Sequence, residues 1–154
     1  MVRKVVKGEG AQSLAEFALV VPLLLLLVFG IIDFGLGLRA YISVSSGVRE
    51  GARYAAVGNT AGTFVAGGTG ECNGTTQTTV VGKVCANMKG LNLDDVTDVT
   101  VTYPNGKTPG NSVVVSAEYD YHYITPIRNI VTFLSGGAID DSITLSATTD
   151  MRLE

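Results

Sequence analysis

One long apolar block dominates the pattern of hydrophobic and polar positions along this chain. The 22 residues from Phe17 to Leu38 are almost all Leu, Val, Ile, Phe, Ala or Gly, with Pro22 and Asp33 as the exceptions. As a helix rising about 1.5 Å per residue, the block would be about 33 Å long, which matches the roughly 30 Å hydrocarbon core of a bilayer. The pattern therefore predicts a membrane anchor over residues 17–38.

A secretory signal peptide is the alternative interpretation of an N-terminal apolar block. This block is longer than the apolar region of a typical signal peptide, and it contains Asp33. Arg39 follows it, where a cleavage site of small residues would be expected. These features favour an anchor that stays with the mature protein.

Beyond the block, apolar residues recur every three or four positions, as they do on one face of a helix. These positions are Tyr41, Val44, Val48, Ala52 and Ala55. The pattern predicts one long helix over 12–57, with the anchor in lipid and the part 41–57 packed on a domain. Gly47 and Gly51 lie on one side of this helix, where they either allow another backbone to approach closely or merely lower helix stability.

The remaining residues show shorter patterns. Gly58 to Gly74 is rich in Gly, Thr and Asn and is typical of a loop, whereas Thr79 to Met88 has helical spacing that Gly90 ends. Three later segments alternate apolar and polar residues, which is typical of antiparallel strands. Their apolar positions are Val99, Val101 and Tyr103; Val113, Val115, Ala117, Tyr119, Tyr121 and Tyr123; and Ile143, Leu145, Ala147, Met151 and Leu153.

Together these patterns predict an α+β fold. A long N-terminal helix, part transmembrane and part amphipathic, packs on a small antiparallel sheet of about three strands, and a short second helix completes the fold. The apolar face of such a sheet needs a cover, and the helical part 41–57 is the available one. The expected organisation is a leader at 1–11, the long helix at 12–57 and an extracytoplasmic α+β domain at 58–154, completed by helix 41–57.

Composition and charge support this organisation and exclude one class of partner. The 154 residues suffice for one anchor and one domain of about a hundred residues. The formal net charge is -3, and basic residues gather only at Arg3, Lys4 and Lys7, so we expect no nucleic acid partner. A basic leader before an apolar helix favours a cytoplasmic N-terminus. We therefore expect a single-pass protein of the inner membrane with its C-terminal domain outside the cytoplasm.

The two cysteines, Cys72 and Cys85, both follow the anchor. Outside the cytoplasm they can close a short loop by a disulfide, which the chain-entropy treatment values at roughly 3 kcal/mol. The alternative is a pair of buried thiols. Two cysteines do not make the four-ligand pattern of a structural zinc site, so no metal is expected there.

The sequence contains no pattern that indicates catalysis, and we expect no enzyme and no cofactor. His122 lies on the polar face of a predicted strand without an evident set of converging partners, which favours a solvated histidine over a metal or acid/base site. Acidic residues expected in polar turns are Asp94, Asp95, Asp140 and Asp141. A calcium site is the alternative for them, although none fits the EF-hand spacing.

The segment before the apolar block is more informative. Gly10-Ala11-Gln12-Ser13-Leu14-Ala15-Glu16-Phe17 places small and polar residues, then a glutamate, at the start of the apolar helix. It resembles the processing site of type IV pilin-like precursors, which a prepilin peptidase cuts on the cytoplasmic side. A cut after Ala11 would make Gln12 the new N-terminus and Glu16 the fifth residue. A cut after Gly10 would keep the glycine that is usual before the cut and make Glu16 the sixth.

Three ordered segments extend this resemblance. They are Gln12-Ser13-Leu14-Ala15-Glu16-Phe17-Ala18-Leu19-Val20, Phe29-Gly30-Ile31-Ile32-Asp33-Phe34-Gly35 and Arg49-Glu50-Gly51-Ala52-Arg53-Tyr54-Ala55-Ala56. At this spacing the chain resembles the TadE-like family, the minor pilins or pseudopilins of the tight-adherence (Flp) branch of type IV pilus systems. The resemblance covers Gly10 to about Val57, and the strand half agrees with it in general character.

The resemblance and the charge pattern together give a set of residues expected to act in assembly. They are Glu16, Phe17, Asp33, Arg49, Glu50 and Arg53. Glu16 is expected to pair with the N-terminal ammonium of a neighbouring subunit, the alternative being a carboxylate that the helix dipole favours at a helix start. Asp33 either contacts a partner helix or Arg39 or lies at the membrane interface. Glu50 and Arg53 form either an assembly contact or an ordinary helix-surface pair.

The expected function is therefore a part in assembling a tight-adherence pilus through helix-helix packing. The expected partners are other pilins or pseudopilins, the pilus assembly machinery, prepilin peptidase and membrane lipid, with self-association as a further possibility. One alternative is the principal structural subunit of a filament. A membrane-tethered ligand-binding or envelope enzyme domain is a weaker alternative.

Overall fold

The computed structural model describes residues 9–58, 68–70, 72, 79–126, 129, 132 and 142–154. The chain divides into two compact units, and each is described by itself. The anchor unit comprises Met1–Phe34 and Tyr123–Ile139, and the domain unit comprises Gly35–His122 and Asp140–Glu154. The predicted acidic turn at Asp140 and Asp141 and the first eight residues of the leader lie outside the described residues.

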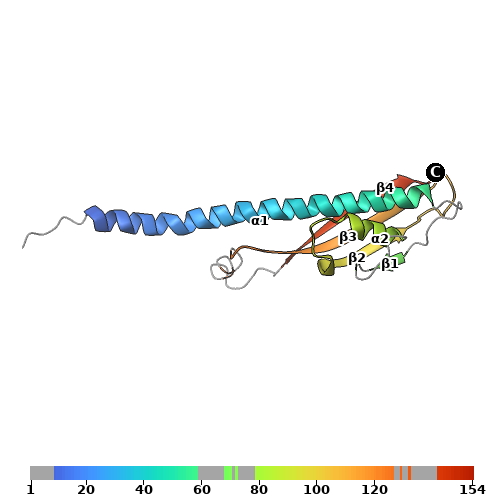
Figure 1. Ribbon diagram of the computed structural model, residues 1–154. Helices are drawn as coiled ribbons and strands as arrows, with labels where there is room; N and C mark the ends of the chain where they lie inside the picture. The colour runs from blue at the N-terminus through green and yellow to red at the C-terminus, as the bar shows by residue number, and fades with distance from the viewer. Residues whose placement is uncertain are drawn as a thin grey trace, which may run out of the picture. The chain divides into compact units, whose positions relative to one another are not determined.

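Helix α1, Glu9–Val57, is 49 residues long and supplies the first element of both units (Figure 1). It continues through Pro22 and begins three residues before the expected start at Gln12. A proline inside a helix removes one backbone hydrogen bond, a loss that membrane helices tolerate. The predicted long helix is confirmed.

The domain unit contains one antiparallel sheet in the order β1-β2-β3-β4. Its strands are β1 Gly68–Gly70, β2 Val96–Thr102, β3 Ser112–His122 and β4 Ser142–Arg152. The last two pair along their whole length, from Ser112 opposite Arg152 to His122 opposite Ser142. The three predicted strands are confirmed. The prediction of a loop over 58–74 was wrong for residues 68–70, because these residues form β1 and pair with β2.

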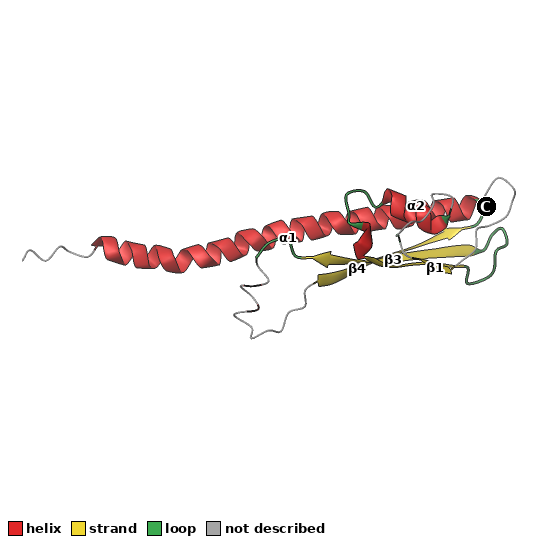
Figure 2. Cartoon of the chain, turned by 60° about the horizontal axis from the view of Figure 1, so that its bottom comes forward, coloured by secondary structure: helices red, strands yellow, loops and turns green. Residues whose placement is uncertain are grey.

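Alternating burial along the strands defines one inner face of the sheet. Along β3 every second residue from Val113 to Tyr121 is buried, as predicted. The second half of α1 and helix α2, Val80–Asn87, cover this face (Figures 1 and 2). The apolar residues of the cover and the sheet with 0% exposure are Val44, Val48, Ala52, Ala55, Val84, Val99, Val113 and Val115.

Several predicted inner positions differ in the structure. Tyr41 is exposed and Ala40 is buried instead, because the buried stripe of α1 runs through Ala40, Val44 and Val48 at four-residue steps. Tyr103 lies just after β2, and Tyr123 lies after β3 in the anchor unit. In β4, Ile143 is 48% exposed, whereas Ala147 on the same face is buried.

Two glycines let α2 pack closely on α1. A Cβ atom at Gly47 would lie 2.7 Å from the carbonyl oxygen of Val84 and 2.8 Å from Cγ of Met88. At Gly51 it would lie 2.3 Å from Cγ2 of Val84. The close backbone approach that the sequence allowed for Gly47 and Gly51 therefore occurs, and the approaching element is α2 of the same chain.

Helix α2 is fixed at both ends. The hydroxyl of Thr79 accepts the Gly82 N–H at 3.0 Å and caps the N-terminus, and the C-cap residue Met88 is buried. Cys85 of α2 forms a disulfide with Cys72, the pair expected from the sequence. This bond ties α2 to the chain that follows β1.

Candidate assembly surface

The apolar part of α1 is exposed along most of its length. Of the most apolar 18-residue window in this helix, 6% is buried within the structure. Exposed side chains include Leu14, Phe17, Leu19, Leu23, Leu24, Leu27, Ile31, Ile32, Phe34 and Leu38. The helix is long and apolar enough to cross a membrane. An apolar surface this extensive is unfavourable in water and indicates lipid or protein as its environment.

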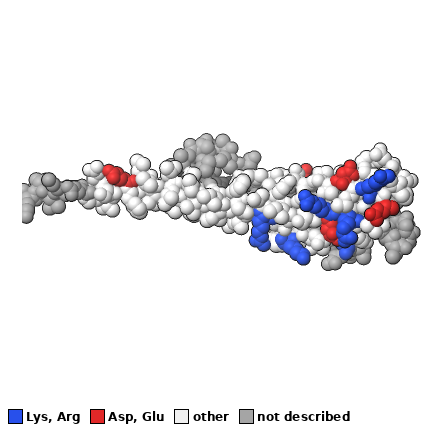
Figure 3. Space-filling view, turned by 90° about the horizontal axis from the view of Figure 1, so that it is seen from above, with Lys and Arg blue, Asp and Glu red and all other residues white. Residues whose placement is uncertain are grey.

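Charge is distributed unevenly between the two units. On the face seen in Figure 3, acidic and basic side chains gather over the domain unit, and the described part of the anchor unit is almost entirely uncharged. Between Gln12 and Leu38 the sequence has two charged residues, Glu16 and Asp33. The structure places these two carboxylates in different surroundings.

Glu16 is an exposed residue in the second turn of the described helix, beside exposed Phe17. Its Oε1 atom accepts a hydrogen bond of 3.1 Å from the side-chain amide of Gln12, four residues earlier. Gly10 and Ala11 of the predicted processing site also lie within α1. The carboxylate of Glu16 is therefore presented outward, in a position open to a group on another molecule.

Asp33 is buried, with 5% of its surface exposed. Its Oδ1 atom accepts the backbone N–H groups of Ile124 at 3.1 Å and of Thr125 at 3.3 Å, and its Oδ2 atom accepts the Thr125 hydroxyl. The two residues that supply these three donors, Ile124 and Thr125, belong to the anchor unit, as Asp33 does. We call this set of hydrogen bonds the Asp33 clasp.

The local sequence explains why these donors are available. β3 ends at His122, and Tyr123–Pro126 belongs to neither a helix nor a strand. Pro126 disfavours a helical conformation at Thr125, so the N–H groups here have no regular ladder to join. The sequence pattern does not identify these donors for Asp33. The sequence does indicate that Asp33 has hydrogen-bond partners, because a carboxylate inside an apolar helix needs polar groups around it.

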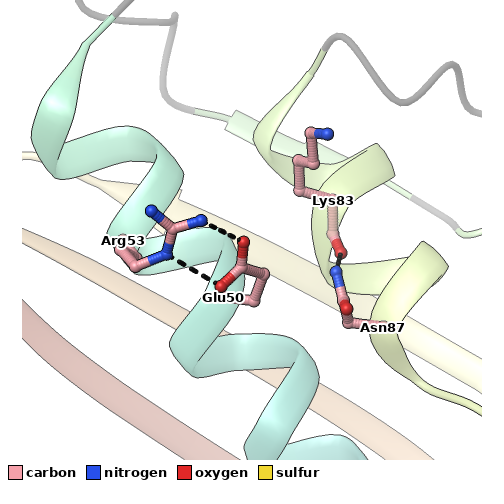
Figure 4. A network of polar contacts seen from close by, with 4 residues as sticks. All are labelled: Glu50, Arg53, Lys83 and Asn87. Atoms are coloured by element: carbon pink, nitrogen blue, oxygen red, sulfur yellow. Dashed lines mark hydrogen bonds and ion pairs between the residues drawn. The ribbon is translucent and has the colours of Figure 1, made fainter.

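Glu50 and Arg53 form an ion pair within α1 (Figure 4). The Nε atom of Arg53 donates to Oε2 of Glu50 at 2.9 Å, and its Nη2 atom donates to Oε1. The side chain of Glu50 is 34% exposed and that of Arg53 is 63% exposed. In α2, the side-chain amide of Asn87 donates to the carbonyl oxygen of Lys83. Arg49, the third predicted residue of this group, is exposed.

The Glu50–Arg53 pair gives a pH-dependent prediction. The hydrogen bond from Arg53 lowers the pKa of Glu50 below its ordinary value of 4.5. A lowered pKa adds stability above the unfolded-state pKa, and this stability is lost as the pH falls through the folded-state pKa. We expect wild type to unfold at a slightly higher temperature than Glu50→Gln at about pH 7, and this difference to be smaller at about pH 3. Thermal unfolding at the two pH values, with Glu118→Gln as an exposed control, measures this, and an equal difference at both would contradict it.

The acidic and histidine residues of the domain unit do not gather into a metal site in the part that the structure describes. Among the described residues, no group of three or more His, Cys, Asp and Glu side chains is placed to hold a metal ion. His122 is mostly exposed, with Nε2 3.8 Å from Oδ1 of Asp95. Asp94 and Asp95 belong to a short 3-10 turn, Leu93–Asp95, that leads into β2.

These observations define a class: an α+β protein with a long N-terminal apolar helix that fits a membrane anchor, a short second helix and an antiparallel sheet. Residues 11–53 match the family model described as TadE-like protein. The match confirms the TadE-like resemblance over the anchor and the first part of the amphipathic helix, and it indicates a protein related to the Tad pilus. No curated protein and no solved structure matches the chain.

Proposed function

We propose that this protein is a TadE-like minor pilin or pseudopilin that takes part in assembling a tight-adherence pilus. The observation that carries the proposal is the family match over residues 11–53, the segment that holds the exposed apolar helix and all six predicted assembly residues. In this proposal α1 crosses the inner membrane once, the N-terminus is cytoplasmic and the domain unit is extracytoplasmic. No step of the function is catalytic.

Exposure of the apolar helix supports a role in helix-helix packing. Its side chains face lipid before assembly and the helices of other pilins or pseudopilins afterwards. Lipid and neighbouring helices both keep the apolar side chains out of water, but only neighbouring helices add specific packing between side chains. Exchange of lipid for protein contacts therefore requires a feature that sets how neighbouring helices align.

Glu16 is the residue that we assign to this alignment. Prepilin peptidase would cut the leader after Ala11, or after Gly10, and so create a free ammonium group about one turn from Glu16. A free ammonium in apolar surroundings is costly unless it is paired, and a carboxylate of a neighbouring subunit is a suitable partner. The exposed position of Glu16, whose described hydrogen bond is to Gln12 of the same helix, supports this assignment.

The other predicted residues take different parts in the proposal. Phe17 is exposed and belongs to the packing surface. Glu50 and Arg53 are assigned to helix stability because they satisfy each other within α1. Arg49 remains exposed for a contact with another subunit or with the assembly machinery. Asp33 is assigned to the clasp within its own chain.

Replacing Glu16 tests the proposal in cells. In a bacterium that carries the gene, we expect deletion to abolish or sharply reduce tight-adherence pili and the wild-type gene to restore them. Removing one charge from a desolvated pair costs about 3–5 kcal/mol, so Glu16→Gln is expected to restore pili at least tenfold less well. Glu118→Gln makes the same chemical change on an exposed strand position and is expected to restore them fully. Electron microscopy of surface fibres measures the result.

The same cells separate the two pilus roles. A minor pilin or pseudopilin is expected to be found at the cell surface in few copies, and immunogold labelling along the whole shaft would instead identify the principal subunit. Unchanged pili after deletion would overturn both. Intact-mass measurement of membrane-extracted protein tests the processing step, with loss of the first 11 residues expected.

A further inference from the structure

The Asp33 clasp fixes a non-helical segment to α1 near the C-terminal end of its apolar block. Asp33 belongs to the apolar block of α1, and the groups that it binds belong to Tyr123–Pro126, after the end of β3. One carboxylate accepts two consecutive backbone N–H groups and a hydroxyl. The segment therefore lies at the level of Asp33 along the helix.

This attachment determines where the bilayer can end. Backbone that is neither helical nor part of a closed sheet occurs at membrane depth only where it is buried in protein or lines a water-filled cavity. Tyr123–Pro126 is such irregular backbone, and Ile124 within it is 70% exposed rather than buried in protein. The level of Asp33 must accordingly lie in the polar interface of the membrane, about five residues nearer the N-terminus than the end of the apolar block at Leu38.

The remaining length of α1 is compatible with this boundary. The 16 residues from Phe17 to Ile32 would measure about 24 Å, and the helix continues towards the N-terminus through Leu14. A span a few ångströms shorter than the hydrocarbon core is accommodated by local thinning of the bilayer or by flanking residues. The apolar residues after Asp33 then lie in or above the interface.

Ile124 gives the clasped segment an apolar surface at this level. Its N–H is held by Asp33, and its side chain is 70% exposed. On α1, Ile31 and Phe34 on either side of Asp33 are 64% and 74% exposed. Ile124 thus adds an exposed apolar side chain at the level of Asp33, from a position 91 residues later in the chain.

We infer that Tyr123–Pro126 is a second membrane contact, in which the Asp33 clasp holds the Ile124 side chain in the lipid interface. The partner is the lipid surface, because Ile124 and the anchor belong to the same unit and the anchor is the surface that lipid covers. The inference rests on the membrane anchoring that the proposed function includes.

Cysteine labelling tests the inference on the full chain in vesicles. Both native cysteines are in the disulfide, so a single added cysteine is the unique site for a fluorescent label. Ile124→Cys is compared with Ile31→Cys on the anchor and with Thr144→Cys, an exposed position of β4. The vesicles contain phosphatidylethanolamine and phosphatidylglycerol with bromine atoms near the top of the acyl chains, which quench a label in the interface.

We expect the label at Ile124 to be quenched at least half as strongly as the label at Ile31, and the label at Thr144 to be unaffected. Quenching at Ile31 without quenching at Ile124 overturns the second contact and leaves the anchor in place. Quenching at neither position overturns the anchor, and with it the proposed function.

The clasp itself is tested in the Ile124→Cys background. Asp33→Ala removes all three hydrogen bonds that Asp33 accepts, and it is expected to lower quenching of the label at position 124 to the level seen at position 144. In a matched variant that combines Asp33→Ala with Ile31→Cys, quenching of the label at position 31 is expected to be retained. Asp33→Asn keeps one carbonyl acceptor and is expected to give an intermediate value. Full quenching at Ile124 in Asp33→Ala would overturn the role of the clasp. Protection of the domain unit from protease verifies that each variant is folded.

Discussion

Replacing Gly47 and Gly51 together by alanine is expected to destabilise the domain unit by about 2 kcal/mol or more. Each new Cβ atom would overlap with α2, and overpacking of this kind costs about 1–3 kcal/mol per site. The gain in helix propensity on changing Gly to Ala returns up to about 1 kcal/mol per site. The overlap prevails because Gly47 faces a backbone oxygen of α2, and Gly51 faces Val84, whose branched side chain has little rotamer freedom in a helix.

Urea unfolding in detergent, followed by the protease resistance of the domain unit, measures this effect. Gly35→Ala is the matched control, because the same change is made on the same helix and a Cβ atom at Gly35 meets nothing within 4 Å. We expect no loss of stability in the control. Equal midpoints for the double variant and wild type would show that α2 moves away from α1 at little cost.

The second large effect is expected on removing the disulfide. Cys72→Ser with Cys85→Ser should lower the free energy of unfolding by about 3 kcal/mol, because the unfolded chain regains the freedom of the closed loop. Both cysteines are buried, so the two hydroxyls would also be placed in an apolar environment. β1 is expected to open first, since it has three residues and pairs only with β2 among the described strands.

Hydrogen exchange and thermal unfolding measure the two parts of this prediction. Exchange at residues 68–70 should increase more than exchange in β3. A reductant should lower the unfolding temperature of wild type towards that of the double variant and leave the variant unchanged. If fully reduced wild type kept its original unfolding temperature, the disulfide would not be a source of stability.

The helices and the longer strands of this protein were predictable because each has its own hydrophobic period. The apolar block and the four-residue stripe through Val44 and Val48 identify α1, and the alternation from Val113 to Tyr121 identifies β3. β1 was not predictable in this way, because Gly68–Gly70 has no apolar alternation and is a strand only through its pairing with β2. The exposure of Tyr41 was missed because the neighbouring Ala40 fits the same helical face equally well.

Long-range contacts of the candidate site were beyond the sequence pattern. Glu50 and Arg53 are three residues apart, so their pairing follows from helix geometry. Gly47 and Gly51 indicated a close approach without identifying α2 as the partner. Asp33 indicated a need for hydrogen-bond donors, but a single sequence contains no signal that links it to Ile124 and Thr125, more than 90 residues later.

β4 has one further consequence for handling the protein. This 11-residue strand pairs with β3 and has no second neighbour among the described strands, so it is an edge of the sheet that these strands form. An open strand edge is a template on which another molecule can add a strand, and charged residues discourage such growth. The charges of β4, Asp150 and Arg152, lie at its C-terminal end, so concentrated preparations should aggregate preferentially through the Ser/Thr-rich N-terminal part of this edge.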